Sequence, residues 1–176
     1  MKLFSDHYIN QLHKLHHFKK SFGTAGKYKG LTSWFEKHQL KSCLDYGCGK
    51  GVLLFNLKDQ YPSCNFTGYD PGIDAFKELP TNKYEGLICT DVLEHIEPNF
   101  IDNVLKHIDS LFTKSAFFII DTVPARKFLS DGRNAHLILE NQEWWTHKIN
   151  EQMPTIKIVQ NVFHEKKKKI IMELEK

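Results

Sequence analysis

The sequence has few cysteines, few arginines and no apolar run long enough to cross a bilayer. Its four cysteines form no C-x-x-C pair, so a zinc cluster is not expected, and reduced thiols are typical of an intracellular protein. Apolar runs such as 116–120 have the length of a strand, and the residues after Met1 turn polar too early for a secretory signal. We therefore expect a soluble, cytoplasmic protein with no membrane-spanning segment.

Positive and negative charges are nearly balanced in the sequence. The 24 Lys and Arg residues face 21 Asp and Glu residues, which leaves a net charge of +3 and gives no reason to expect nucleic acid or a membrane surface as partner. Aromatic residues make up 12% of the 176 residues, far more than in a disordered chain, and the length suits one domain with its own core. The composition makes no prediction about oligomeric state.

Helical and strand patterns alternate along most of the chain. Residues 5–20 and 31–40 have apolar side chains at helical spacing, and we expect residues 1–40 to form a helical lid over a core of residues 41–176. In that core, strands are expected at 43–46, 64–69, 84–90 and 115–121, and helices at 50–59, 99–112 and 140–149. This alternation is typical of a parallel sheet covered by helices on both faces.

The C-terminal tail changes character, with β-rich runs at 155–163 and 168–174 that predict an antiparallel hairpin closing the sheet. The four-lysine run from Lys166 to Lys169 is interpreted as the solvated turn of this hairpin. On the first helix, His13, His16 and His17 are interpreted as a solvated or rim-packed face rather than a metal site, because no carboxylate accompanies them.

A glycine-rich segment, Asp45-Tyr46-Gly47-Cys48-Gly49-Lys50-Gly51, joins the first expected strand to the helix that follows. Glycines at such a turn let the backbone approach a ligand closely. The spacing G-x-G-x-G differs from the dinucleotide pattern G-x-G-x-x-G, and an acid two residues before the first glycine suits an ammonium group better than a pyrophosphate. Asp70 ends the second strand, about where a ribose-binding carboxylate is expected.

Residues 40–175 resemble the class I S-adenosylmethionine-dependent methyltransferases. The resemblance rests on Asp45-x-Gly47-x-Gly49-x-Gly51, on Asp70 and on the segment Asp91-Val92-Leu93-Glu94-His95-Ile96. It implies an α/β fold with a Rossmann-like parallel sheet and a C-terminal antiparallel hairpin, and S-adenosylmethionine as the cofactor. The residues that it assigns to cofactor binding are Asp45, Gly47, Cys48, Gly49, Gly51, Asp70, Pro71, Thr90 and Asp91.

The sequence departs from this family between Asp70 and Tyr84. The usual fold has a third strand with flanking helices there, but only residues 71–83 separate the two points. Two crossovers and a strand cannot fit in that length, since one parallel crossover already needs about a dozen residues. We therefore expect a sheet without that edge strand. The adenine contacts usually made by its loop must then come from elsewhere, with Pro71, Gly72 and the residues before Tyr84 as candidates.

The segment after the strand ending at Thr90 suggests a metal site. Asp91, Glu94 and His95 stand at i, i+3 and i+4 and would face one point if Asp91 opens a helical turn. The pattern is similar to that of two families, the metal-dependent methyltransferases that act on the terminal ribose of small RNAs and the ubiquinone-pathway O-methyltransferases. This resemblance implies one further histidine ligand downstream. His136, in the loop after the strand ending at Asp121, is the candidate for it. Such a set suits Mg, Mn, Fe or Zn. The alternatives are a motif that only shapes the pocket and His95 as a metal-free general base.

The chain's two arginines, Arg126 and Arg133, lie in the loop after the strand ending at Asp121. Arginine binds carboxylate and phosphate groups in a bidentate way, so both are candidates to bind an anionic group on the acceptor, and Trp144 is a candidate to line its pocket. We predict methyl transfer from S-adenosylmethionine to a hydroxyl of a small, anionic acceptor, with assistance from a divalent metal.

Two other functions remain open at this point. One is a catalytically inactive, cofactor-binding regulatory or assembly subunit, which the intact glycine loop and Asp-x-x-Glu-His segment disfavour. The other is an RNA-terminal 2'-O-methyltransferase, which the absence of a basic, aromatic surface in the sequence disfavours.

Overall fold

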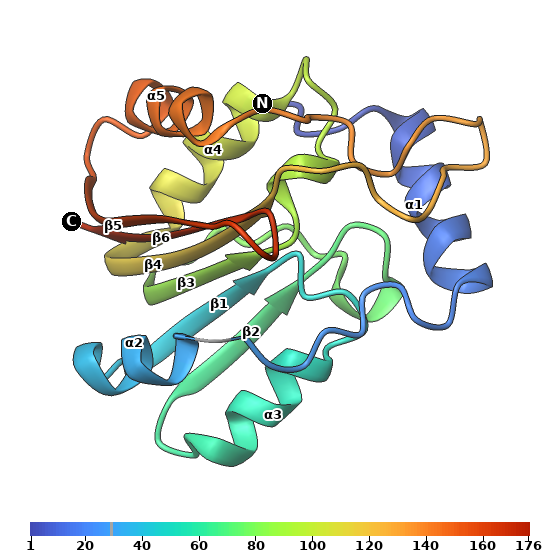
Figure 1. Ribbon diagram of the computed structural model, residues 1–176. Helices are drawn as coiled ribbons and strands as arrows, with labels where there is room; N and C mark the ends of the chain where they lie inside the picture. Colours follow the sequence, from blue (N-terminus) through green and yellow to red (C-terminus); the bar gives the residue numbers. More distant parts are fainter. Residues whose placement is uncertain (29) are drawn as a thin grey trace.

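The computed structural model describes residues 1–28 and 30–176. One six-stranded sheet with the order β2-β1-β3-β4-β6-β5 runs through it (Figure 1). Neighbours among β1 to β4 run parallel, whereas β6 pairs antiparallel with both β4 and β5, so the expected parallel sheet and C-terminal hairpin are confirmed. The strand bounds are β1 Ser42–Tyr46, β2 Asn65–Tyr69, β3 Tyr84–Thr90, β4 Phe112–Asp121, β5 Lys157–His164 and β6 Lys169–Glu175.

The connection between β2 and β3 is as short as the sequence requires. Residues 71–83, all of them described, contain a single 3₁₀ turn, η1 (Asp74–Phe76), and no strand. As a result, β2 lies at one edge of the sheet. The expected loss of the usual edge strand is confirmed.

Helices cover the sheet on both faces, with α2 and α3 on one side and α4 and α5 on the other (Figure 1). Alternation along β4 explains the two layers, because Phe117 and Ile119 pack with α2 and α3 while Ala116, Phe118 and Ile120 pack with α4 and α5. The bounds are α2 Leu31–His38, α3 Val52–Gln60, α4 Ile101–Leu111 and α5 Gln142–Gln152.

The first helix, α1 (Asp6–Phe18), lies apart from these layers, at the end of the sheet toward which the β1 and β2 arrows point (Figure 1). It begins after Ser5, whose Oγ accepts a hydrogen bond from the backbone N–H of Tyr8 at 3.0 Å. The second helix of the predicted lid, α2, packs on the sheet instead, and Trp34 Nε1 donates to Ser115 Oγ of β4 at 2.8 Å. Of the two helices, only α1 is therefore placed where it can cover a site at the strand ends.

Among residues 1–28 and 30–176, no helix has the length and apolar character needed to cross a membrane.

Candidate active site

A pocket of about 670 Å³ opens at the carboxyl ends of the parallel strands, where open α/β sheets bind ligands. Its walls come from the glycine loop after β1, the ends of β2 and β3, α1, the segment after α1 and the loop after β4. Of the residues predicted to bind cofactor, those that line it are Asp45, Gly47, Cys48, Gly49, Asp70, Pro71, Thr90 and Asp91. Gly51 does not line it and instead precedes α3 with φ +77°.

Two glycines of the loop cannot carry a side chain. A Cβ atom at Gly47 would lie 2.3 Å from a methyl carbon of Val92, and one at Gly49 would lie 2.6 Å from Cα of Gly23. Both residues also have positive φ, +81° and +54°. The loop is therefore packed tightly between the start of η2 (Leu93–His95) and the segment that follows α1.

The backbone N–H groups of the loop are already used within the protein. Those of Gly47 and Cys48 donate to the Tyr69 carbonyl at 2.7 and 3.0 Å, and that of Gly49 donates to Asp70 Oδ2 at 2.9 Å. The N–H of Lys50 donates to the Gly23 carbonyl at 2.8 Å. This arrangement offers no cradle of free donors for a pyrophosphate, which supports the interpretation of G-x-G-x-G as a loop of close approach.

Asp45 is the buried acid at the end of β1. Its side chain is 2% exposed, and Oδ2 has no hydrogen-bond partner among the described residues. Burial raises the pKa of Asp45 to about 7, and the nearby Asp70 carboxylate adds to the rise. A buried carboxylate oxygen without a partner is costly, and because Asp45 belongs to the pocket lining, a cationic ligand group there would relieve that cost.

Asp70, at the end of β2, is held by backbone donors. Its Oδ1 accepts from the N–H of Gly72 and its Oδ2 from that of Gly49, both at 2.9 Å. His16 Nε2 lies 3.6 Å from Oδ1, but burial lowers the pKa of His16 to about 4, so the imidazole is neutral there. Of the two alternatives predicted for the histidines of α1, a solvated or a rim-packed face, His16 fits the packed one, because it is buried against Asp70 and Phe22 at the pocket wall.

Asp91 follows β3 in the left-handed region, with φ +55°, and does not open a helical turn. Its Oδ1 accepts from Lys169 Nζ at 2.6 Å and its Oδ2 from the Tyr28 hydroxyl at 3.2 Å. The lysine also lies 3.4 Å from Asp121. Two predictions are corrected: Asp91 does not join the proposed metal ligands, and Lys169 belongs to β6 and the pocket wall rather than to a solvated turn.

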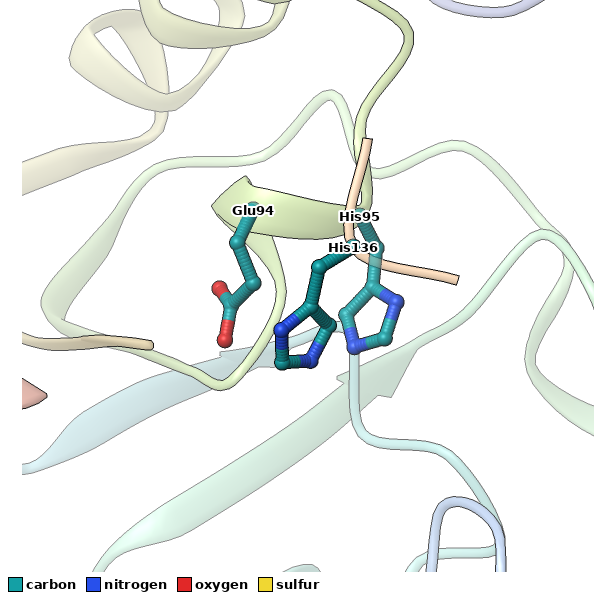
Figure 2. Close-up of side chains that lie close together, drawn as sticks. All are labelled: Glu94, His95 and His136. Carbon is teal, nitrogen blue, oxygen red and sulfur yellow. The ribbon is translucent and has the colours of Figure 1, made fainter. Parts of the chain in front are cut away.

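The other three predicted metal ligands do converge. Glu94 and His95 come from η2 and His136 from the loop after β4, and one potential ligand atom of each lies within 4.8 Å of the others (Figure 2). Nδ1 of His95 bonds to the Ala135 carbonyl at 2.8 Å and Nδ1 of His136 to the Val123 carbonyl at 2.6 Å, so in both rings Nδ1–H is the donor. Each ring therefore keeps Nε2 as an acceptor.

The electrostatics of this cluster favour neutral side chains. Burial, reinforced by the charge of Asp91, raises the pKa of Glu94 well above its usual range. Of the two carboxylate oxygens of Glu94, Oε1 accepts a hydrogen bond from the backbone N–H of Asp121 at 3.0 Å. The other, Oε2, is buried and has no hydrogen-bond partner in the part of the chain that is described. Burial, with His136, lowers the pKa of His95 to about 3. A neutral imidazole is the form that binds a metal, and it is a weak proton acceptor by itself.

The predicted acceptor residues are not all at the pocket. Arg126 lines it, but Arg133 pairs with Asp131, with Nη2 at 2.7 Å from Oδ2, outside the lining. Trp144 lies on α5 and packs against Trp145, so it is not a pocket residue either. Sequence reasoning missed Lys127, which lines the pocket with Nζ 5.2 Å from the centre of the Phe22 ring.

The comparisons with known proteins agree with this geometry. A family model described as a methyltransferase domain matches residues 11–163, most of the chain. The chain belongs to this methyltransferase domain family. The sequence-based recognition of a class I methyltransferase, made from the glycine loop and the acids that follow it, is thereby confirmed. No curated protein matches this sequence.

Solved structures show the same fold at low identity. Magnesium protoporphyrin IX methyltransferase (ChlM) from Synechocystis PCC 6803, with bound SAM, is 15% identical over 100% of both chains, with a TM-score of 0.65. A Burkholderia thailandensis 1,6-didemethyltoxoflavin-N1-methyltransferase is 15% identical over 100% of this chain and 92% of that one, with a TM-score of 0.65.

An O-methyltransferase family protein from Burkholderia thailandensis is 10% identical, with a TM-score of 0.60. That alignment covers 97% of this chain but 59% of the other, so the chain spans little more than half the length of some of its structural neighbours.

Proposed function

We propose that this methyltransferase binds S-adenosylmethionine in the pocket and transfers its methyl group to a hydroxyl of a small, anionic acceptor. The observation that carries the cofactor is the carboxylate of Asp45, buried at the pocket without a partner for Oδ2 among the described residues. S-adenosylmethionine supplies an amino-acid ammonium group, a ribose and an electrophilic methyl group on a sulfonium centre. Two of its structural neighbours, the Synechocystis and Burkholderia enzymes, hold SAM and S-adenosylhomocysteine.

Each polar part of the cofactor has a candidate partner on this chain. Asp45 receives the ammonium group, and the glycine loop approaches the amino-acid part through Gly47 and Gly49. Asp70 accepts the ribose hydroxyls, since each of its oxygens holds one backbone N–H and has a lone pair to spare. Thr90 and Asp91, at the end of β3, border the sulfonium.

Calorimetric titration with S-adenosylmethionine tests this assignment. We expect Asp70→Ala to weaken binding by removing the ribose acceptor, and Gly49→Val to abolish close approach of the loop. Asp59→Ala, a change to an exposed acid of α3, is the matched control and should bind like the parent. Parent-like binding by both pocket variants would refute the assignment.

A hydroxyl acceptor is supported by the side chains beyond Thr90. His95 lines the pocket with its Nδ1 side held by the Ala135 carbonyl, so in the absence of a metal its Nε2 can accept a hydrogen bond from the acceptor hydroxyl as the methyl group is transferred; with a metal bound, the same Nε2 would bind the ion instead. Arg126 and Lys127 also line the pocket, and no salt bridge among residues 1–28 and 30–176 pairs either with a carboxylate. Both are therefore available to bind an anionic group of the acceptor.

A divalent metal is the second part of the proposal, and Glu94, His95 and His136 would hold it. The unpartnered Oε2 of Glu94 is the observation that favours this site. A metal there would lower the pKa of the acceptor hydroxyl. One potential ligand atom of each side chain lies within 4.8 Å of the others, which is close enough for all three to reach one ion with at most small side-chain movements.

Metal binding is tested by titrating Mn²⁺ and Zn²⁺ into the parent, Glu94→Gln and Asp91→Asn. The glutamine oxygen can still accept the Asp121 N–H, so folding should survive while metal affinity falls. Asp91→Asn should keep its metal affinity because Asp91 points to Lys169. A screen of acceptors with and without chelator completes the test. If chelator leaves the activity unchanged and Glu94→Gln and Asp91→Asn bind the metals equally well, the metal site is refuted. His95 would then contact the acceptor hydroxyl without a metal.

A further inference from the structure

Several residues that line the pocket near Asp70 are apolar. Within the described residues, Pro71 is the sole member of 71–83 that lines the pocket. The wall comes instead from the N-terminal segment and from two elements of the sheet end. Its members are Phe4, Tyr8, Leu12, Tyr46, Pro71 and Ile96.

Helix α1 presents one continuous face to this part of the pocket. Tyr8, Leu12 and His16 are spaced by four residues, and all three line the pocket. The same face reaches Asp70: a Cβ atom at Gly72 would lie 3.0 Å from Leu12 Cβ, 3.0 Å from His16 Cδ2 and 3.3 Å from Asp70 Oδ1. Leu12 and the carboxylate to which the ribose is assigned therefore both lie next to Gly72.

The helix is fixed in this position by polar contacts at its N-terminal end. Ser5 donates to Glu97 from both its backbone N–H and its Oγ, each at 2.8 Å. The Tyr8 hydroxyl donates to the His95 carbonyl at 2.6 Å. These bonds tie α1 to η2 and to the residues that follow it, so the apolar face is a built wall of the pocket.

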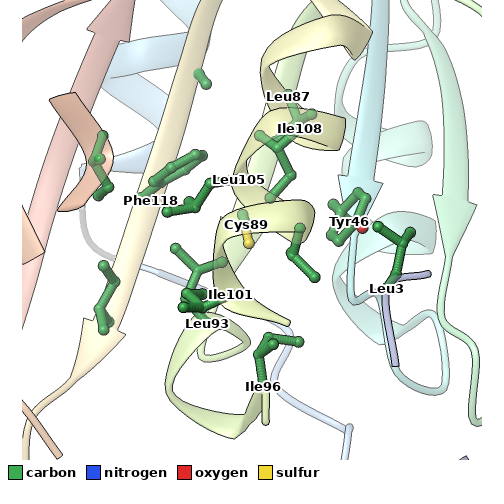
Figure 3. Close-up of a cluster of buried hydrophobic side chains, with 14 of the residues drawn as sticks. Leu3, Tyr46, Leu87, Cys89, Leu93, Ile96, Ile101, Leu105, Ile108 and Phe118 are labelled. Atoms are coloured by element: carbon green, nitrogen blue, oxygen red, sulfur yellow. The ribbon is translucent and has the colours of Figure 1, made fainter. Parts of the chain in front are cut away.

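The wall presents apolar surface to the pocket. The hydroxyl of Tyr8 is used by His95, and that of Tyr46 lies 3.1 Å from His107 Nδ1, so both rings have their polar ends satisfied within the protein. Tyr46 ends β1 and Ile96 directly follows η2; both lie on the helix-α4 side of the sheet, with Leu3 of the N-terminal segment beside Tyr46 (Figure 3). Such a surface favours a flat, aromatic ligand group.

We propose that the N-terminal segment, through Phe4, Tyr8 and Leu12, forms the subsite for the adenine ring of the cofactor. This inference rests on the proposed function, which places the ammonium group at Asp45 and the ribose at Asp70. The base attached to that ribose then extends to the apolar wall of α1. The segment replaces the contacts that the absent edge strand cannot make.

Two buried leucines of α1 give a matched pair for the test. Leu12 is 8% exposed and lines the pocket, whereas Leu15 is 5% exposed and does not. Binding of three ligands is measured by calorimetry on folded protein: S-adenosylhomocysteine, adenosine, and S-ribosylhomocysteine, which lacks the base. Leu12→Ala should weaken the first two by about tenfold, the loss expected for part of a leucine contact, and leave the third unchanged. Leu15→Ala should bind all three like the parent.

Three outcomes would overturn the subsite. They are parent-like binding of S-adenosylhomocysteine by Leu12→Ala, equal losses in the two leucine variants, and an equal loss for S-ribosylhomocysteine. If Leu12→Ala does not fold, Phe4→Leu, which trims the ring and keeps an apolar side chain, takes its place with the same ligands. Failure of the parent to bind S-adenosylhomocysteine would refute the proposed function and the subsite with it, whereas parent binding with any of the three outcomes refutes the subsite alone.

Discussion

Replacing Asp45 with asparagine is expected to stabilise the ligand-free protein at alkaline pH and to weaken cofactor binding. The carboxylate is 2% exposed, and burial, with Asp70, raises its pKa to about 7 from 3.8. Because the folded state holds the proton more tightly than the unfolded state, this group lowers stability as pH rises from about 4 to about 7. An uncharged asparagine lacks this pH dependence and cannot pair with an ammonium group.

The size of the effect follows from the shift in pKa. One unit corresponds to 1.36 kcal/mol, so ionising Asp45 in the fold costs about 4 kcal/mol over the whole range and about 3 kcal/mol between pH 5 and pH 8. Asparagine retains a buried polar group, which offsets part of the gain by about 1–2 kcal/mol. The variant should therefore be more stable than the parent by about 1–3 kcal/mol at pH 8 and roughly equal to it, or less stable, at pH 5.

Urea denaturation of the parent and Asp45→Asn at pH 5 and pH 8 measures this directly. The difference between variants, compared across the two pH values, isolates Asp45 because all other titrating groups are shared. Asp59→Asn, at an exposed position, is the control and should show no such difference. Calorimetry at pH 6 in two buffers gives a second readout: the parent should release about one proton on binding S-adenosylmethionine, and the variant none.

Cofactor affinity should fall in the variant by about 10- to 100-fold, the equivalent of one hydrogen bond to a charged group. The reasoning is refuted if Asp45→Asn is destabilised to the same degree at pH 5 and pH 8. That result would mean that the carboxylate is satisfied by the fold itself and has no need of a ligand.

Three further variants test single contacts. Gly49 has φ +54°, and a Cβ atom added there would lie 2.6 Å from backbone atoms of Gly23. Gly49→Ala should therefore lower the free energy of unfolding, measured by urea denaturation, by about 1–3 kcal/mol, and parent-like stability would contradict the tight packing of the loop. His95→Ala should lower kcat by at least about 100-fold with little change in cofactor affinity, and a parent-like kcat would remove His95 from the reaction. Lys169→Met should lower the free energy of unfolding by about 1–3 kcal/mol, because Asp91 loses the cation that it pairs with. Lys168→Met, at the exposed turn, should change the free energy of unfolding little, and equal stabilities of the two variants would contradict the pairing of Lys169 with Asp91.

The fold was predictable because its signals are local. Each strand and helix of the core shows its own periodicity, and the absent edge strand follows from counting the residues between Asp70 and Tyr84. The placement of α2 was not predictable in the same way. Its apolar face fits either a lid or the sheet, and the choice depends on Trp34 meeting Ser115, about 80 residues away, which no local pattern encodes.

Most of the residues that the sequence assigned to the cofactor line the pocket, whereas two of the three assigned to the acceptor do not. Asp45, the glycines and Asp70 follow strand ends, so the parallel sheet brings them together. Arg133 was assigned to the acceptor from its position in a loop, but nothing in the sequence shows that Asp131, two residues away, takes its guanidinium. Residues of α1 were missed because their role depends on where the helix docks.

The misassignment of Asp91 has a specific physical cause. Spacing of i, i+3 and i+4 brings side chains together in a helix, but Asp91 takes up a left-handed conformation, which aspartate tolerates better than most residues. Its carboxylate then turns toward the start of β6. Antiparallel β6 begins at the edge where the parallel strands end, so Lys169 is the first residue of that strand to meet the carboxylates of Asp91 and Asp121. This topological argument needs only the order of the strands, and it identifies pocket residues in a C-terminal hairpin that composition alone assigns to solvent.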